Sequence, residues 1–309
     1  MTSKILVLIP LVLIGLSIQW NLMAHSMIAR MAEIELSNAA DKPILEKVYA
    51  KINQMSKFFD TVEVTGSLLE VAVIPDILNF EWKGFLDHYH YKDLPELYRN
   101  DDPSFVLPRT NEVNAENALK AAKQIIKESF VPDPKKFLKP GFLDSLYTRY
   151  LIHVVGDVHQ PLHTMSLYSK IYLNGKIING DLGGNLIRIQ VPGEKNMKPL
   201  HAYWDDGFGL WTRMDKFPYD EATKKSIYQK AEDLMKEYPK SYYGDRVNIL
   251  DEKIWIEESH DLAVKIAYAD IDIFPTVRPE YILRGRKISK ERVALAGYRL
   301  ANLLRDLFK

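Results

Sequence analysis

The chain has 309 residues, of which 47% are hydrophobic, so it is long and apolar enough to bury the core of one large domain. That composition excludes a disordered chain, and only the N-terminus is apolar for long enough to approach a membrane. Lys+Arg and Asp+Glu both number 41, so there is no net field to hold a polyanion. There is no cysteine, which excludes disulfides, thiolate zinc sites and cysteine nucleophiles. Any metal site must therefore use His, Asp, Glu or backbone groups.

The first segment, residues 1–19, predicts a signal peptide. Lys4 supplies the positive start, and residues 5–16 form an apolar run that is too short to span a bilayer comfortably. An uncleaved anchor is the alternative. We expect cleavage before Trp20, a mature domain over residues 20–309, and a final location that is secreted or in a lysosome-like or vacuolar lumen.

The dominant hydrophobic period along the mature chain is helical. One face near the N-terminus has helical spacing and consists of Met27, Ile28, Met31 and Ile34. An apolar stripe from Val293 to Leu307 predicts a C-terminal helix with Ser289 as its N-cap. Four further helices are predicted over residues 114–130, 144–157, 222–237 and 255–270.

The strand signal is confined to one region. Residues 172–178 predict a hairpin around Asn174-Gly175, and the apolar alternation over 187–191 predicts a half-buried strand. Clusters of Pro and Gly predict loops over residues 101–108, 131–141 and 192–199. We therefore expect a single, mostly α domain with a small β-hairpin insertion.

The most informative segment runs from His153 to Asp205. His153 and Asp157 are four residues apart, as are His201 and Asp205, so on a helix each pair places an imidazole and a carboxylate on the same face. Imidazole and carboxylate without thiolate suit catalytic zinc. The alternative is that these histidines cap helices or sit in the core as neutral, hydrogen-bonded groups. Spacing alone indicates neither which metal binds nor how many ions.

A set of strings across the whole mature chain is similar to one known family. The strings are Gly156-Asp-Val-His-Gln-Pro-Leu-His163, Asp181-Leu-Gly-Gly-Asn185, Leu200-His-Ala-Tyr-Trp-Asp205, Trp20 with His25 five residues later, Asp76 ahead of His90-Tyr91-Lys92-Asp93, and Ala296-Gly-Tyr-Arg-Leu-Ala301. Together they resemble the class I nucleases, the single-strand-specific trinuclear zinc nucleases known as nucleases S-one and P-one. The resemblance implies the helical fold of the phospholipase C and P-one nuclease type.

The resemblance also implies three zinc ions per chain and a set of ligand residues for each ion. The first set is Asp76, His90, His153 and Asp157, the second is His163, His201 and Asp205, and the third is Trp20, His25 and Asp157 as a bridge. Trp20 would bind through its free amine and its carbonyl. An α-amino group has a pKa near 8, so zinc can displace its proton at neutral pH. Only removal of the leader exposes that amine.

The activity that the resemblance implies is hydrolysis of single-stranded DNA and RNA to 5′-phosphate products, together with 3′-nucleotidase activity. Three zinc ions and three aspartates leave a site of about +3, which holds a phosphodiester without a basic surface. We expect nucleic acid and 3′-nucleotides as substrates, no protein partner, no stable membrane association and a monomer. A zinc phospholipase C-like phosphodiesterase and a non-catalytic helical binding protein are the alternatives.

Further residues receive candidate roles, and those of Tyr91 and Asp93 come from the same resemblance. Tyr91 would stack on a nucleobase and Asp93 would accept from its edge, and the alternative is a core tyrosine and a solvated acid. Asn185 would contact the phosphate or cap its own loop. Asp181 would orient a zinc-bound histidine or occupy a turn. His159 is expected to be structural.

One position departs from the family pattern. Three residues after Asp76, many members carry an Arg or Lys that stabilises the transition state, and here that position is Asn79. Asp76, Asn79 and Asn185 form the expected catalytic set. A neutral amide makes a weaker bond than a charged donor, so we expect a slower enzyme or an altered substrate range. The predicted 172–178 hairpin would lie beside the site and shape access to it.

Overall fold

Helices make up most of the structure, a computed structural model that describes residues 21–57, 67–81, 86–128, 141–211, 217–270 and 276–309. The α-helices are α1 (Leu22–Leu36), α2 (Lys42–Ile52), α3 (Leu68–Val71), α4 (Ile74–Glu81), α5 (Ala115–Glu128), α6 (Phe142–Asp157), α7 (Leu200–Asp205), α8 (Glu221–Glu237), α9 (Lys240–Tyr243), α10 (Glu252–Leu262) and α11 (Pro279–Phe308). Short 3₁₀ helices are η1 (Asn53–Lys57), η2 (Asp87–His90), η3 (Pro161–His163), η4 (Tyr172–Gly175) and η5 (Gly244–Asn248), and η6 (Ala263–Ala267) is π-helical.

The helices predicted from hydrophobic period are present, but the one predicted over residues 255–270 is α-helical only to Leu262 and continues as the π-helical η6. Side-chain caps explain several starts: Asn21 accepts from the N–H of Ala24 at α1, and Asp220 accepts from that of Thr223 at α8. The predicted cap Ser289 is wrong. It lies buried inside α11, which begins ten residues earlier at Pro279, because proline suits the first turn of a helix.

The predicted hairpin over residues 172–178 is also wrong. Leu173 and Asn174 both adopt left-handed backbone angles, and the segment coils as η4. Ile177 turns inward and is fully buried, and its carbonyl accepts from the N–H of Ser169. The Asn-Gly pair therefore makes a turn, but the chain on either side of it does not pair as strands.

Two small sheets flank the helices. β1 (Leu94–Leu97) pairs in parallel with β2 (Met165–Tyr168), and β3 (Arg188–Ile189) pairs antiparallel with β4 (Lys198–Pro199). The alternation predicted for the 187–191 strand is confirmed, since Ile187, Ile189 and Val191 are buried and Arg188 is exposed. The β1–β2 pair was not predicted, because four residues containing a proline carry no alternating signal.

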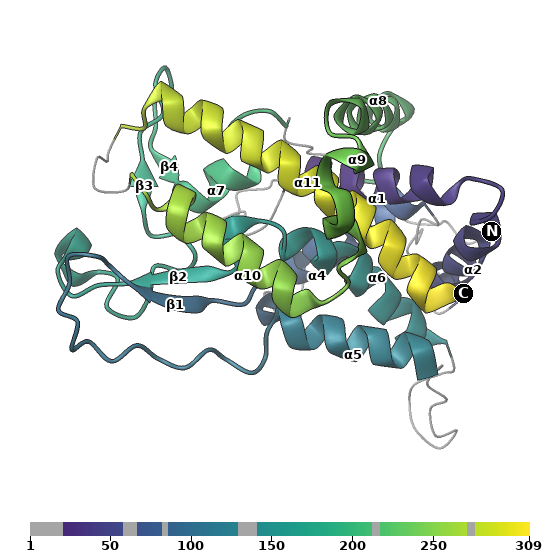
Figure 1. Cartoon of the computed structure of the whole chain (residues 1–309), viewed down its shortest axis with the longest axis horizontal. Helices are drawn as coiled ribbons and strands as arrows, with labels where there is room; N and C mark the ends of the chain where they lie inside the picture. The colour runs from purple at the N-terminus through teal and green to yellow at the C-terminus, as the bar shows by residue number, and fades with distance from the viewer. Residues whose placement is uncertain (1–20, 58–66, 82–85, 129–140, 212–216, 271–275) are drawn as a thin grey trace, which may run out of the picture.

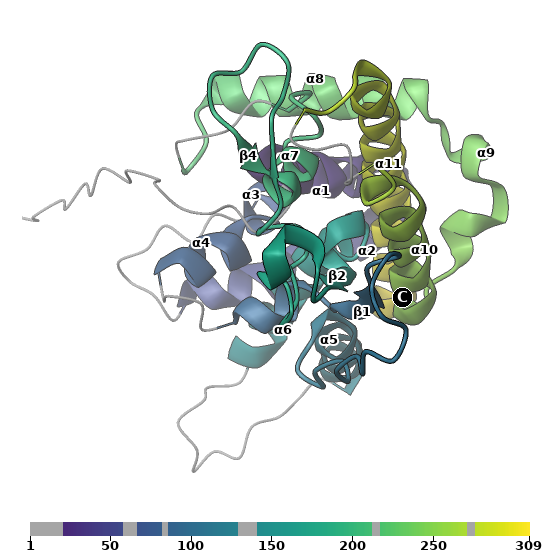
Figure 2. The same cartoon turned by 90° about the vertical axis from the view of Figure 1, so that its left-hand side faces the viewer.

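The helices pack around α11, which crosses the molecule from the β3–β4 end to the C-terminus (Figure 1). α1 lies along α11, with α8 on one side and α6 on the other, and the view in Figure 2 places α5 and α6 on the side opposite α8. The main hydrophobic core joins these helices, and a second cluster lies around β2, α7 and the start of α11. The prediction of one mostly α domain with small β elements is confirmed.

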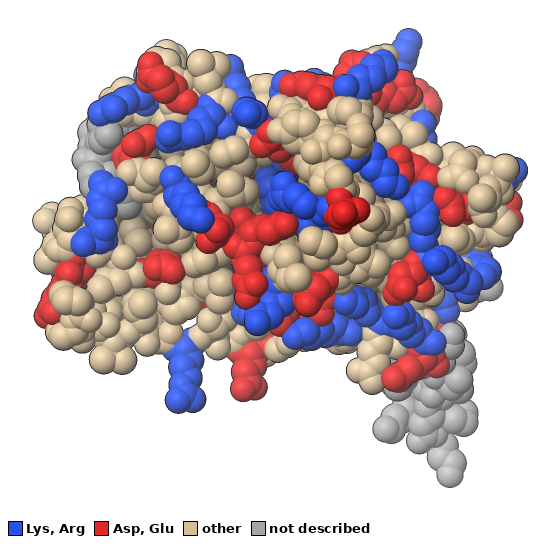
Figure 3. All heavy atoms as spheres, viewed as in Figure 1, with Lys and Arg blue, Asp and Glu red and all other residues tan. Residues whose placement is uncertain are grey.

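The surface is mixed in charge. Figure 3 shows basic and acidic side chains interspersed over the viewed face, as the equal counts of the two signs indicate. Among the described residues, no helix combines the length and the apolar character that crossing a bilayer requires.

Candidate metal centre

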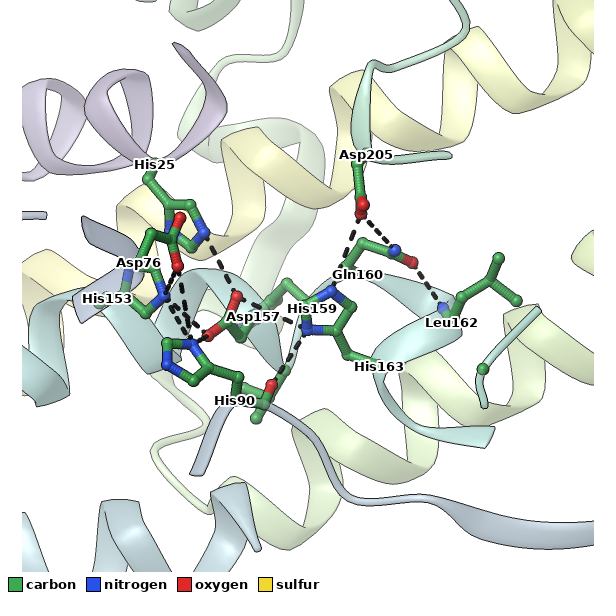
Figure 4. A network of polar contacts seen from close by, with 12 residues as sticks. His25, Asp76, His90, His153, Asp157, His159, Gln160, Leu162, His163 and Asp205 are labelled. Carbon is green, nitrogen blue, oxygen red and sulfur yellow. Dashed lines mark hydrogen bonds and ion pairs between the residues drawn. The ribbon is translucent and has the colours of Figure 1, made fainter. Parts of the chain in front are cut away.

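Three groups of histidine and aspartate side chains meet in the interior, and they come from helices that are far apart in the sequence (Figure 4). Eight of the nine predicted metal ligands belong to these groups, and Trp20 lies outside the described residues. The contributing elements are α1 (His25), α4 (Asp76), η2 (His90), α6 (His153 and Asp157), η3 (His163) and α7 (His201 and Asp205).

The predicted first ligand set lies together around one point. Nε2 of His153 is 3.0 Å from Oδ1 of Asp76 and 3.0 Å from Oδ2 of Asp157. Nδ1 of His90 is 2.9 Å from the same Nε2 and 3.0 Å from Asp157 Oδ2. A cation held between the two carboxylates and the two ring nitrogens would offset the cost of burying them.

Asp157 lies close to histidines from all three groups. Its Oδ2 atom points to His90 and His153, whereas Oδ1 lies 3.2 Å from Nε2 of His25 and 3.5 Å from Nδ1 of His163. Figure 4 shows this carboxylate between the surrounding rings. One side chain can therefore serve two ions. His25 also lies within ligand distance of Asp76 and His153.

In the remaining group the ligand atoms are farther apart. Nε2 of His163 is 3.8 Å from Oδ1 of Asp205, and Nε2 of His201 is 3.5 Å from Oδ2 of the same carboxylate. Zinc forms bonds of about 2.0–2.2 Å to imidazole nitrogen and carboxylate oxygen, so an ion fits between atoms at this separation. The ligand atoms within each of the three groups all lie within 4.8 Å of one another.

Backbone carbonyls orient three of the rings. The Nδ1–H groups of His153, His163 and His201 donate to the carbonyl oxygens of Ala72 (2.6 Å), His90 (3.0 Å) and Gly183 (2.7 Å), respectively. A carbonyl oxygen only accepts, so Nδ1 carries the proton and Nε2 is left to bind a metal. The fold itself thereby selects the tautomer of each ring.

Two glycines let the groups approach one another. A Cβ atom on Gly156 would lie 2.8 Å from Nδ1 of His25, so any side chain there would displace that ring from α6. Gly183 has a φ of +61°, and a Cβ there would lie 2.5 Å from the carbonyl oxygen of Leu162. The Gly-Asp and Gly-Gly-Asn strings therefore contain glycine for steric reasons.

Several atoms that face the centre are buried without a regular hydrogen bond among the described residues, and their near neighbours are one another. They are Nε2 of His25, Nε2 of His163, Oδ1 of Asp76, Oδ1 of Asp157 and Oδ2 of Asp205. Buried polar atoms normally form hydrogen bonds, so this concentration of donors and acceptors fits a site for metal ions. Burial alone would raise the pKa of Asp157, but His153 and His25 hold it well below its usual range. The donor set fits zinc.

Gln160 supports this centre and was not singled out by the sequence. Its Nε2 donates to Oδ1 of Asp205 at 2.8 Å, and its Oε1 accepts from the N–H of Leu162. Gln160 therefore holds one metal ligand in place while it caps η3, which carries another, His163. Its place inside the Gly-Asp-Val-His-Gln-Pro-Leu-His string was the only available signal.

Both predicted base-binding residues line a pocket of about 190 Å³. Tyr91 and Asp93 share its lining with His88, Arg109 and Tyr168. Burial, reinforced by the charge of Asp181, raises the pKa of Asp93 to about 7. Asp93 is thus a partly buried acid that faces a cavity, which argues against the alternative of a solvated surface acid.

Asn79, Asn185 and Asp181, which were predicted to act at the site, form hydrogen bonds with other residues of the fold. Nδ2 of Asn79 donates to Oδ1 of Asp87 at 3.2 Å, and Nδ2 of Asn185 donates to the carbonyl oxygen of Leu182 at 2.8 Å. Asn185 therefore caps its own loop. Asp181 accepts from the N–H of Leu167 and the hydroxyl of Tyr268, so it braces β2.

Of the two alternatives for Asp181, the orientation of a histidine is not seen, because the rings of His153, His163 and His201 bond to backbone carbonyls instead. His159 is structural, as expected. Its Nδ1–H donates to the carbonyl oxygen of Val155, and its Nε2 lies 3.0 Å from Nη1 of Arg299. Burial and the nearby arginines hold the pKa of His159 well below its usual range.

Several known proteins that are similar in sequence are named endonucleases or nucleases. Endonuclease 4 of Arabidopsis thaliana is 26% identical over 330 residues, covering 99% of this chain and 94% of that protein. Endonuclease 5 of the same plant is 29% identical over 163 residues, and Nuclease S1 of Aspergillus oryzae is 25% identical over 169 residues. These two matches cover 52% and 50% of this chain, and about half the length of each relative (50% and 51%).

The S1/P1 Nuclease family model matches residues 20–309, which include every element that contributes a side chain to the metal centre. The mostly helical fold fits the same family. Most of the buried histidines and aspartates of the centre lie in the strings that carry the resemblance. On these grounds the chain belongs to the S1/P1 nuclease family.

Proposed function

We propose that this protein is a zinc-dependent endonuclease that hydrolyses phosphodiesters of single-stranded DNA and RNA to 5′-phosphate products, and that it also acts as a 3′-nucleotidase. The observation that carries the proposal is the juxtaposition of three buried His/Asp groups with the pocket of Tyr91 and Asp93. His90 belongs to one of the groups and precedes Tyr91 directly, so a nucleotide held by its base would place its phosphate near the ligands.

The residues divide the chemistry between them. Asp76, His90, His153 and Asp157 would hold one ion, and His163, His201 and Asp205 a second. When bound, zinc supplies Lewis-acid activation of water and neutralises the charge of the phosphodiester. Tyr91 provides a ring for stacking, which requires a base already free of a duplex stack. That requirement is the physical basis for the proposed preference for single strands.

A third ion would need the mature N-terminus. We propose that cleavage before Trp20 creates this N-terminus and that the protein is secreted or vacuolar. The match to the family model begins at residue 20, which supports this boundary. The N–H of Asn21 donates to the carbonyl oxygen of Asp205 at 3.3 Å, and Asn21 caps the helix that carries His25. The chain therefore enters α1 directly beside the centre.

The test combines N-terminal sequencing, zinc content and digestion of the secreted protein. We expect Trp20 at the terminus, about three zinc ions per chain, and products with 5′-phosphate ends from single-stranded DNA. Metal content near zero after gentle purification would contradict the proposal and favour a non-catalytic binding protein. Hydrolysis of phosphatidylcholine without digestion of DNA would assign the centre to a phospholipase-type reaction.

A further inference from the structure

A second pocket lies near the same centre and has no role in the proposed reaction. It measures about 210 Å³ and lies between η2, α5 and α6. Three tyrosines, Tyr89, Tyr147 and Tyr150, contribute to its lining, together with apolar side chains that include Leu86 and Leu146. We name it the tyrosine pocket.

The tyrosine pocket and the Tyr91–Asp93 pocket are neighbours. Val113 contributes to the lining of both. Tyr89 lines the first and Tyr91 the second, and the metal-group residue His90 lies between them in the chain. The ring centroids of His90 and Tyr150 are 6.1 Å apart. A strand whose phosphate lies at the centre would thus have a pocket for a base near each side of it.

Tyr150 indicates what kind of group the tyrosine pocket accepts. The residue is only 6% exposed, and its hydroxyl has no hydrogen-bond partner among the described residues. A tyrosine side chain carries an O–H group, so this hydroxyl can donate a hydrogen bond. A buried donor without a partner is costly, and a ligand with an acceptor atom would satisfy it.

The other lining residues narrow the choice further. None of the described lining residues is lysine or arginine, so the pocket does not favour a phosphate. A lipid acyl chain would fill an apolar groove but would leave the Tyr150 hydroxyl unpaired. A nucleobase has both a flat face for the tyrosine rings and acceptor atoms on its edge.

We propose that the tyrosine pocket binds a second unstacked base of the substrate strand, that of the nucleotide on the 3′ side of the scissile phosphate. Tyr147 and Tyr89 provide ring surface, and the Tyr150 hydroxyl donates to the base edge. This inference rests on the proposed nuclease function. A 3′-nucleotide fills only the Tyr91–Asp93 pocket, whereas an oligonucleotide fills both, so the second pocket favours polymer over mononucleotide.

The test is a cycle of substrate and enzyme changes. The substrates are a dinucleotide and its analogue with an abasic second nucleotide, and the enzymes are the wild type and Tyr147→Ala. Loss of a base stack should lower kcat/KM by roughly 5- to 100-fold in the wild type, mainly through KM. In Tyr147→Ala, removal of the second base should lower kcat/KM only slightly, because the stacking ring is already absent. An equal cost in both enzymes would overturn the proposal.

Controls separate the pocket from general damage. Tyr147→Phe keeps the ring and should retain the full effect of the second base, whereas Tyr150→Phe removes the donor and should lower kcat/KM about 2- to 10-fold for the base-bearing substrate alone. Tyr242→Ala changes a half-exposed tyrosine on α9, a helix that packs against α11 rather than α5, and should leave the ratio between substrates unchanged. A Tyr150→Phe loss shared by the abasic substrate would contradict the assigned hydrogen bond.

Failure of the proposed function gives a different result. If the wild type cleaves neither substrate, the nuclease proposal fails, and fluorescence anisotropy with a labelled oligonucleotide and its abasic analogue still tests the pocket. Weaker binding of the abasic oligonucleotide by the wild type, but not by Tyr147→Ala, would support it. Hydrolysis of phosphatidylcholine vesicles that Tyr147→Ala abolishes would show that the pocket takes an acyl chain and overturn it.

Discussion

Nε2 of His25 lies 3.2 Å from Oδ1 of Asp157, which joins the first described helix of the protein to the middle of the chain. The other oxygen of Asp157 faces His90 and His153. Both oxygens of Asp157 therefore contact histidines, and the carboxylate links His25 on α1 to the group on α6. His153 is shared in the same way, since it belongs both to the group of His25 and to the group of His90.

Asp157→Asn should therefore lose bound zinc and nearly all activity. The amide keeps the size of the side chain but removes the charge that both groups share. Residues that only support a metal ligand cost about 10- to 100-fold when replaced, and the loss of a direct shared ligand should exceed that. Zinc per chain and the rate of single-stranded DNA cleavage are the measurements. Asp144→Asn, on the same helix but paired with Lys51, serves as the control. Full zinc content in Asp157→Asn would contradict the bridging role.

Gln160→Leu should weaken zinc binding while leaving the protein folded. Leucine has a similar size but cannot donate to Asp205, which Gln160 holds at 2.8 Å. We expect zinc affinity to fall about 10- to 100-fold, as for other partners of metal ligands, measured by competition with a chelator. Gln124→Leu, at an exposed position on α5, is the matched control. Unchanged affinity would mean that the backbone alone positions Asp205.

Asn79→Arg should make a faster enzyme. The side chain of Asn79 bonds Asp87, and a guanidinium at this position could pair with that carboxylate while it offers a charged donor to the substrate. Charge-assisted bonds are about twice as strong as neutral ones, so a gain in kcat on the order of 10-fold is expected. Steady-state kinetics on single-stranded DNA measure it, with Asn79→Gln as the uncharged control. No gain would mean that another cation already supplies the charge.

Stability in acid should depend on Glu258. Its carboxylate accepts from Arg292 at 2.9 Å and from Arg299 at 2.7 and 2.9 Å. Burial alone would raise its pKa, but the arginines lower it to about 2. Because the unfolded chain takes up this proton at a higher pH than the folded one, the contribution to stability is full above about pH 4.5 and is lost as the pH falls to about 2.

Glu258→Gln should remove that dependence. We expect the free energy of unfolding to fall by roughly 2–4 kcal/mol at pH 7, with the difference from the wild type shrinking below pH 4.5. Denaturant titrations at several pH values measure it, and Glu257→Gln, next along the same helix and more exposed, is the control. A difference that is constant with pH would show that Glu258 acts through packing alone.

Local pattern was sufficient for the helices and for the identity of the ligands. Hydrophobic period places α1, α5, α6 and α8, because their buried faces repeat at the helical spacing. His153 with Asp157, and His201 with Asp205, could be paired because each pair lies one turn apart on its own helix. The ligands that lie far apart in the sequence were identified only from the resemblance, because no local spacing relates them.

Local pattern failed where distant parts of the chain decide the conformation. The 172–178 segment has a hairpin signal, but burial of Ile177 and its bond to Ser169 coil it instead. The β1–β2 pair joins residues about seventy positions apart, so nothing near either strand indicates its partner.

By itself, the sequence determined the helical class, the metal-binding residue types and the family. The tertiary structure alone decided how the site is held, because backbone carbonyls from Ala72, His90 and Gly183 orient the rings and carry no residue signature. It also decided that Asp181 braces a strand and that Gln160 holds Asp205. The tyrosine pocket arises only when η2, α5 and α6 pack together, since the side chains that line a cavity share proximity in space and no period in the chain.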